Sequence, residues 1–123
     1  MNIVISNSTD QPIYMQIKNQ IKEQILHGEL DEKEALPSIR KLAKELQISV
    51  ITTKKAYEEL EKEGFIETYP SKGSFVAAQN QDLLNEKQLK AIEEQMVKMI
   101  EDSQAFNITL DELISMMTLL YEE

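Results

Sequence analysis

The sequence predicts a mainly helical protein with one small β-hairpin, divided into an amino-terminal unit of residues 1–78 and a helical tail of residues 79–123. Two observations predict this division. Within residues 36–77, two closely spaced helical patterns precede two short strand patterns around a Pro-Ser-Lys-Gly turn. Beyond residue 82, apolar residues recur every three or four positions along most of the tail. We therefore expect a winged helix-turn-helix followed by a two-helix hairpin.

The first helix is predicted to begin near Pro12 and to end at His27. Asp10 is the expected N-cap, with Pro12 tolerated in the first turn. Gly28 suits the left-handed conformation that follows many helix ends. Residues 3–5 (Ile-Val-Ile) form either a short strand or an arm that packs on another element. One apolar stripe at four-residue spacing faces the core of the unit: Ile13, Ile17, Ile21 and Ile25.

Two short helices joined by a tight turn are predicted between Ser38 and Glu63. Ser38 and Ser49 are the expected N-caps of the two helices, and residues 47–49 form the turn. The small side chain of Ala43 suits the close crossing that such a turn requires. The inward positions of the second helix are Val50 or Thr53, then Ala56, Tyr57 and Leu60.

The hairpin is predicted from residues 65–69 and 74–77, which are rich in aromatic and β-branched residues. Residues 70–73 form the turn between the two strands. Upstream, Leu30 and Leu36 bracket an acidic segment. This segment lacks the glycine and the ligand spacing of a calcium loop, so we interpret it as a solvated loop.

The tail is predicted to begin with a polar linker, Gln79-Asn80-Gln81-Asp82. A helix follows from Leu83 or Asn85 to Gln104, and Thr109 with Glu112 has the form of a capping box that opens a second helix. Twenty of the 39 residues from position 83 to 121 are apolar, too many for two helices that pack only on each other. A unit this short also does not normally fold alone. We therefore predict a dimerisation hairpin with these interface residues: Leu89, Ile92, Met96, Met99, Leu110, Leu113, Met117 and Leu120.

The charge of the chain is unevenly distributed. The formal net charge is −9, of which −7 lies in residues 79–123 and −2 in residues 1–78. Between Arg40 and Lys55 the balance reverses to +4, with Glu45 as the single acidic residue. A local basic patch can hold phosphates, while an acidic tail is repelled by DNA. Charge alone does not separate such a patch from an ordinary solvated helix surface.

The chain lacks the residues that several classes of function require. The chain has no cysteine and one histidine, His27, so the sequence predicts no disulfide, no thiol chemistry and no metal site. No Ser-His-Asp set and no glycine-rich phosphate loop occurs, and we predict no enzyme, no catalytic residue and no cofactor. The chain also lacks a run of about 18 apolar residues and a signal pattern, so no membrane partner is expected. We predict a cytoplasmic protein.

The chain resembles the GntR family of transcriptional regulators, in its short YtrA-like branch. The resemblance runs in one register over about two thirds of the chain. The motifs that carry it are Pro-Ile-Tyr-Met-Gln-Ile at 12–17, Gly28, Leu-Pro-Ser-Ile-Arg-Lys-Leu-Ala at 36–43, residues 46–49, Thr52, Ala-Tyr at 56–57, Leu-Glu at 60–61, Glu-Gly at 63–64 and Lys-Gly-Ser-Phe-Val at 72–76. A short helical tail is also typical of this branch.

The resemblance implies a DNA-binding surface. Arg40 matches an arginine that contacts DNA in the family, and Ser38 matches a position that touches phosphate. The recognition helix would present Ser49, Val50, Ile51, Thr52 and Lys54, and the wing tip would present Lys72 and Gly73. Where many relatives have polar residues, this chain has Val50 and Ile51, which can only contact a thymine methyl or exclude a base. Ser71 replaces a wing glycine.

We therefore predict a homodimeric, sequence-specific DNA-binding transcriptional regulator, a repressor that binds a pseudo-palindromic operator. The alternative is a winged-helix protein-interaction module that acts through its acidic helical tail. The residues identify no small-molecule effector, and a tail this small leaves room for a pocket only at a dimer interface.

Overall fold

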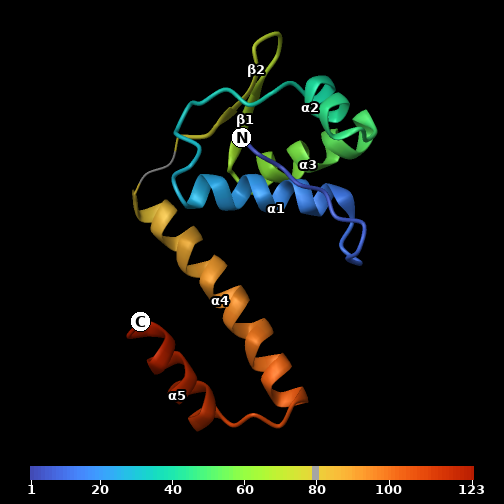
Figure 1. Ribbon diagram of the computed structural model, residues 1–123. Helices are drawn as coiled ribbons and strands as arrows, with labels where there is room; N and C mark the ends of the chain where they lie inside the picture. The colour runs from blue at the N-terminus through green and yellow to red at the C-terminus, as the bar shows by residue number, and fades with distance from the viewer. Residues whose placement is uncertain (79–80) are drawn as a thin grey trace. The chain divides into compact units, whose positions relative to one another are not determined.

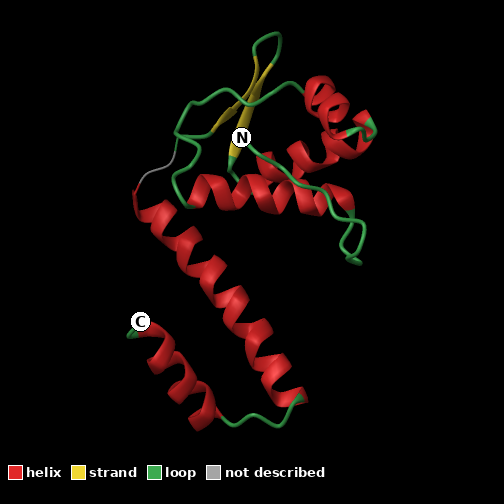
Figure 2. Cartoon of the chain, in the orientation of Figure 1, coloured by secondary structure: helices red, strands yellow, loops and turns green. Residues whose placement is uncertain are grey.

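The structure is a computed structural model that describes residues 1–78 and 81–123 (Figure 1). The chain forms two compact units, Met1–Gln81 and Asp82–Glu123. The predicted fold class is confirmed: the described residues form mainly helices, with one two-stranded antiparallel sheet (Figure 2). In chain order the elements are α1 (Ile13–Leu26), α2 (Ile39–Leu46), α3 (Val50–Lys62), β1 (Ile66–Tyr69), β2 (Gly73–Val76), α4 (Gln81–Ala105) and α5 (Leu110–Tyr121).

The core of the first unit lies around α3, which packs against α1, α2 and β1. The predicted stripe on α1 is confirmed for its last three members, since Ile17, Ile21 and Ile25 are buried, while Ile13 is half-buried. The predicted N-cap of α1 is wrong. Pro12 occupies that position, and its carbonyl accepts bonds from the first turn, while no side chain caps the helix.

The amino-terminal segment lies on α1 as an extended arm. Three glutamines spaced four residues apart on α1 bind every second residue of the arm through their side-chain amides, joining Gln16 to Ser6, Gln20 to Val4 and Gln24 to Asn2. Gln20 forms two of these bonds: its Oε1 accepts from Val4 N at 2.9 Å and its Nε2 donates to Val4 O at 2.7 Å. The side-chain amides of the three glutamines therefore bind the backbone of the arm as the edge of a neighbouring β-strand would.

The sheet extends beyond the predicted hairpin. β1 and β2 pair in antiparallel register from Ile66 opposite Val76 to Tyr69 opposite Gly73. Residues 33–36 then pair with the free edge of β2, where Leu36 N donates to Ser74 O at 2.9 Å and Val76 N donates to the Glu34 carbonyl at 2.9 Å. The interpretation of this acidic segment as a loop is therefore wrong in part, because its backbone is tied to the wing.

The second unit consists of α4, a turn and α5. α4 begins at Gln81, earlier than the predicted Leu83 or Asn85, so two residues of the predicted linker are helical. The other two, Gln79 and Asn80, lie outside the described residues. The predicted capping box of Thr109 and Glu112 is confirmed. Of the residues described in α4 and α5, only Ser103 is buried.

Candidate nucleic-acid interface

Local hydrogen bonds fix the two ends of the α2–turn–α3 unit. Ser38 Oγ accepts a bond from Lys41 N and Ser49 Oγ accepts one from Thr52 N, both at 3.1 Å, which confirms the two predicted N-caps. Gln47 ends α2 in the left-handed conformation, with φ 57°. The end of α2 and the start of α3 are therefore both capped within residues 47–49, so a short turn joins the two helices.

Tyr57 connects α3 to the start of α2. Its ring is buried, and its hydroxyl donates a hydrogen bond to the Pro37 carbonyl at 2.7 Å. Pro37 directly precedes the N-cap of α2, so this bond holds the segment that leads to Arg40 against α3. The sequence pattern identified Tyr57 only as a core residue. The signal that was available is that a buried tyrosine hydroxyl usually finds a partner.

Burial, followed by the charge of Glu45, raises the pKa of Tyr57 well above its ordinary value. The unfolded chain therefore loses the tyrosine proton at a lower pH than the folded chain, and stability falls as pH rises above about 10. We expect Tyr57→Phe to lower the free energy of unfolding by about 1 kcal/mol at pH 7, because the Pro37 carbonyl loses its donor. The variant should also lose less stability at alkaline pH. Urea unfolding at pH 7 and pH 10.5 measures both effects, and equal alkaline losses in the two proteins would contradict this account.

The start of α3 presents apolar side chains to solvent. Ile51 is 81% exposed and Val50 is 46% exposed, whereas Thr53, on the opposite side of the helix from Ile51, is fully buried. Of the two alternatives left for the inward position, Thr53 is therefore the correct one. Thr52 is half-buried, and its Oγ1 accepts a hydrogen bond from the Ser49 hydroxyl at 2.8 Å.

Two lysines on α3 have different surroundings. Lys54 is exposed, and its Nζ lies 3.8 Å from a carboxylate oxygen of Glu58, one turn further along the helix. Such an exposed pair is weak and can be displaced by a stronger anion. Lys55 lies over the ring of Tyr14, with Nζ 4.0 Å from the ring centroid, and so links α3 to α1. Because Lys55 is held against Tyr14 and Lys54 only by a weak ion pair, we expect Lys54 to turn more readily toward a phosphate.

The wing tip is a tight turn closed by a bond from Lys72 N to Tyr69 O at 3.0 Å. Pro70 occupies its second position and Ser71 its third, with φ 68°, the arrangement of a type II turn. Ser71 thus adopts a conformation that glycine would adopt with less strain. Gly73 has φ 103°, and no atom lies within 4 Å of the position where a Cβ would be. Lys72 is exposed between these two residues.

The predicted DNA-binding residues therefore come from three parts of the first unit: the start of α2, the start of α3 and the wing tip. Figure 1 shows α2 and the wing tip on the side of this unit that faces away from α1. Thr52 is half-buried and the other predicted residues are exposed: Ser38, Arg40, Ser49, Val50, Ile51, Lys54, Lys72 and Gly73. In the part of the chain that the structure describes, no cluster of His, Cys, Asp and Glu is arranged to hold a metal ion, and no helix could cross a membrane.

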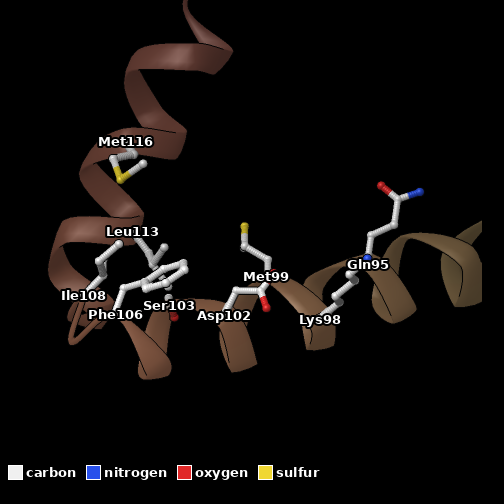
Figure 3. A pocket seen from close by; sticks show the side chains of 9 residues that line it. All are labelled: Gln95, Lys98, Met99, Asp102, Ser103, Phe106, Ile108, Leu113 and Met116. Carbon is white, nitrogen blue, oxygen red and sulfur yellow. The ribbon is translucent and has the colours of Figure 1, made fainter. Parts of the chain in front are cut away.

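The tail exposes most of its apolar side chains. Among the predicted interface residues, Leu89 is 70% exposed, and Ile92, Met96, Leu110, Met117 and Leu120 are also exposed. Met99 and Leu113 are half-buried. These two residues line an open hollow of about 370 Å³ at the bend between α4 and α5, together with Phe106 and Met116 (Figure 3). The sequence prediction did not include Val97, Ile100, Ile114 and Leu119, which are exposed as well.

A helix pair whose second helix exposes its first turn, followed by a hairpin, defines the class of winged helix-turn-helix proteins. Within that class, the family model "Bacterial regulatory proteins, gntR family" matches residues 13–76. The chain belongs to this GntR family. The matched range contains all the predicted DNA-binding residues.

The relatives of this chain are transcription regulators. The HTH-type transcriptional repressor YtrA of Bacillus subtilis is 36% identical over 90% of this chain and 85% of its own length. A structure described as a transcriptional antiterminator from Listeria monocytogenes has a TM-score of 0.77 and 32% identity, covering 100% of this chain and 91% of its own. The AraR DNA-binding domain, in complex with operator ORE1, has a TM-score of 0.53 and 25% identity, covering 63% of this chain and 94% of its own. The protein is thus a regulator and not an enzyme.

Proposed function

We propose that this protein is a homodimeric, sequence-specific DNA-binding transcriptional regulator that acts as a repressor. In this proposal, residues 1–78 bind DNA and residues 79–123 form the dimer. The observation that carries the proposal is that the start of α3, α2 and the wing tip of one unit all present exposed residues, cations among them, in a chain of the GntR family. The repressor YtrA and the operator complex of the AraR domain support it as relatives. Such a regulator acts in the bacterial cytoplasm, where the chromosome lies.

The predicted DNA-binding residues can be assigned different roles. Arg40 can form two parallel hydrogen bonds, either to one phosphate or to the N7 and O6 acceptors of guanine. Lys54 and Lys72 carry point charges that suit phosphate oxygens. Ser38 accepts a bond from its own helix but keeps a hydroxyl proton for a phosphate oxygen. The wing backbone at Gly73 can approach DNA closely because it has no side chain.

The exposed apolar surface of the tail supports the proposal that the tail forms the dimer interface. Unit 2 buries only Ser103 among its described helical residues, while large apolar side chains lie exposed along both helices. Contiguous apolar surface of this kind marks an interaction site. A second copy of the same tail presents the same apolar residues and can cover them around a twofold axis. The net charge of −7 in residues 79–123 would keep the dimerised tails away from DNA.

A twofold dimer predicts the shape of its binding site. We expect the operator to be a pseudo-palindrome whose half-site centres lie about 34–36 Å apart, or a multiple of that distance. Footprinting on a duplex selected from random-sequence DNA by the full chain measures this spacing. Protection of one asymmetric half-site at saturating protein would exclude the symmetric mode of binding.

The second candidate function is a protein-interaction module that acts through the acidic tail. The acidity and apolar exposure of the tail favour it. A salt titration separates the two candidates. For a DNA-binding protein, the logarithm of the binding constant falls with the logarithm of salt concentration by about 0.9 for each phosphate contacted. An interaction module would show no saturable binding to any selected duplex.

A further inference from the structure

Ile51 lies on the side of α3 that faces away from the core of the unit. Nine residues separate it from the buried Leu60, which is about two and a half helical turns, so the two side chains point in opposite directions. Its exposed fraction of 81% is well above the 46% of the adjacent Val50. Of the two apolar residues at the start of α3, Ile51 therefore offers the larger exposed surface to a partner.

The polar groups around Ile51 are partly engaged within the chain. The Ser49 hydroxyl donates a hydrogen bond to Thr52 Oγ1 at 2.8 Å and accepts one from Thr52 N at 3.1 Å. Ser49 therefore acts as a helix cap and has no proton to donate to a base. Thr52 itself is half-buried beneath this bond. The most exposed apolar group at the start of α3 is thus the branched side chain of Ile51.

We propose that Ile51 is a specificity-determining residue that selects thymine by packing against its C5-methyl group in the major groove. This inference rests on the proposed DNA-binding function. The first residues of a recognition helix are those that reach the base edges. Thymine is the base that presents a methyl group in that groove. The β-branched side chain of Ile51 has one strongly preferred rotamer in a helix, so its methyl groups are held in place before DNA arrives.

The competing interpretation is that Ile51 only excludes polar contacts and recognises no base. The two interpretations predict different results when the C5-methyl group of a thymine is removed from the DNA. Replacing thymine by uracil removes the C5-methyl group and leaves the hydrogen-bonding groups of the base pair unchanged. If Ile51 buries that methyl group, replacing the thymine by uracil weakens the binding free energy by about 0.8 kcal/mol at each half-site, which lowers the affinity about 4-fold. If Ile51 only excludes polar contacts, the affinity does not change.

The experiment uses a duplex selected from random-sequence DNA by the full chain. Each thymine is replaced singly by uracil, and affinities are measured for the wild type, Ile51→Ala and Val50→Ala. We expect one thymine in each half-site to show a loss of about 4-fold with the wild type. We expect Ile51→Ala to bind the parent duplex more weakly than the wild type, and with this variant the loss caused by uracil should disappear. Val50→Ala should keep it and so serves as the matched control.

The outcomes separate the inference from the function on which it rests. If no uracil duplex binds more weakly than the parent, or if Ile51→Ala shows the same loss as the wild type, Ile51 does not read a thymine methyl. In both cases DNA binding itself stands. If no duplex is enriched from the random pool, the proposed DNA-binding function is wrong and the inference falls with it. The exposure of Ile51 means that Ile51→Ala should fold normally, which circular dichroism and urea unfolding verify.

Discussion

Replacing Leu89, Ile92 and Met96 together by glutamine is expected to convert a dimer into a monomer and to weaken operator binding by about 100-fold or more. The three side chains lie three and four residues apart on α4 and are all exposed in the single chain. Glutamine keeps helix propensity but removes the apolar surface that a second copy would bury. Without the linked partner, each winged unit binds its half-site alone and loses the gain in effective concentration. Sedimentation velocity and a binding titration measure the two changes.

A matched control replaces acidic residues that are exposed on the same helix. Glu93→Gln with Glu101→Gln introduces glutamine into α4 without removing apolar surface, and this variant should remain dimeric. If the triple variant also remains dimeric, the interface lies elsewhere. The next candidate is the arm at residues 3–5, where Val4 is exposed beside the half-buried Ile3 and Ile5.

Substitution of Arg40, Lys54 and Lys72 by alanine is expected to produce two kinds of loss. If Arg40 reads a base, Arg40→Ala should cost roughly 1–3 kcal/mol per monomer, mainly on the specific duplex, because the paired hydrogen bonds of a guanidinium to guanine are lost. Lys54→Ala and Lys72→Ala should weaken binding to specific and random DNA alike. Each should also lower the salt slope by about one unit for the phosphate contact removed. The measurement is affinity for both duplexes across a salt series.

Two further variants sharpen this comparison. Arg40→Lys keeps the charge but not the planar fork, so it should lose specificity while its salt slope stays near that of the wild type. Lys62→Ala removes an exposed lysine from the last turn of α3, far from the start of the helix, and should leave both affinities unchanged. All five substitutions lie on exposed side chains and should leave the fold intact. If replacing Arg40, Lys54 and Lys72 leaves the affinity for both duplexes unchanged, this surface does not contact DNA. The result would then favour the protein-interaction module.

Most of the secondary structure could be predicted because it depends on neighbours within one helical turn. Ser38, Ser49 and Thr109 each cap a helix by accepting a bond from a backbone N–H three residues later, and all three caps were predicted. Local rules were less reliable where two of them compete. The first turn of α1 takes Pro12 as its N-cap in place of Asp10, and α4 begins before the predicted linker has ended.

For the candidate site, the sequence identified the residue types and their order along the chain. It did not reveal which hydroxyl groups already donate a hydrogen bond within the chain, that Lys55 lies on the ring of Tyr14, or that Ile51 is more exposed than Val50. These differences depend on packing between elements, which a pattern of residue types does not specify. The roles assigned to Arg40, Lys54 and Lys72 remain predictions for the experiments above.

The sequence by itself determined the helical periods, the caps at Ser38, Ser49 and Thr109, the hairpin and the family, because each depends on residues close together in the chain. Only the tertiary structure decided where polar groups far apart in sequence find their partners. Val4 meets Gln20 across 16 residues, and the Tyr57 hydroxyl meets the Pro37 carbonyl across 20. The segment before α2 joins the edge of β2 for the same reason. A buried or extended backbone needs hydrogen-bond partners, and the folded chain determines which groups come within reach.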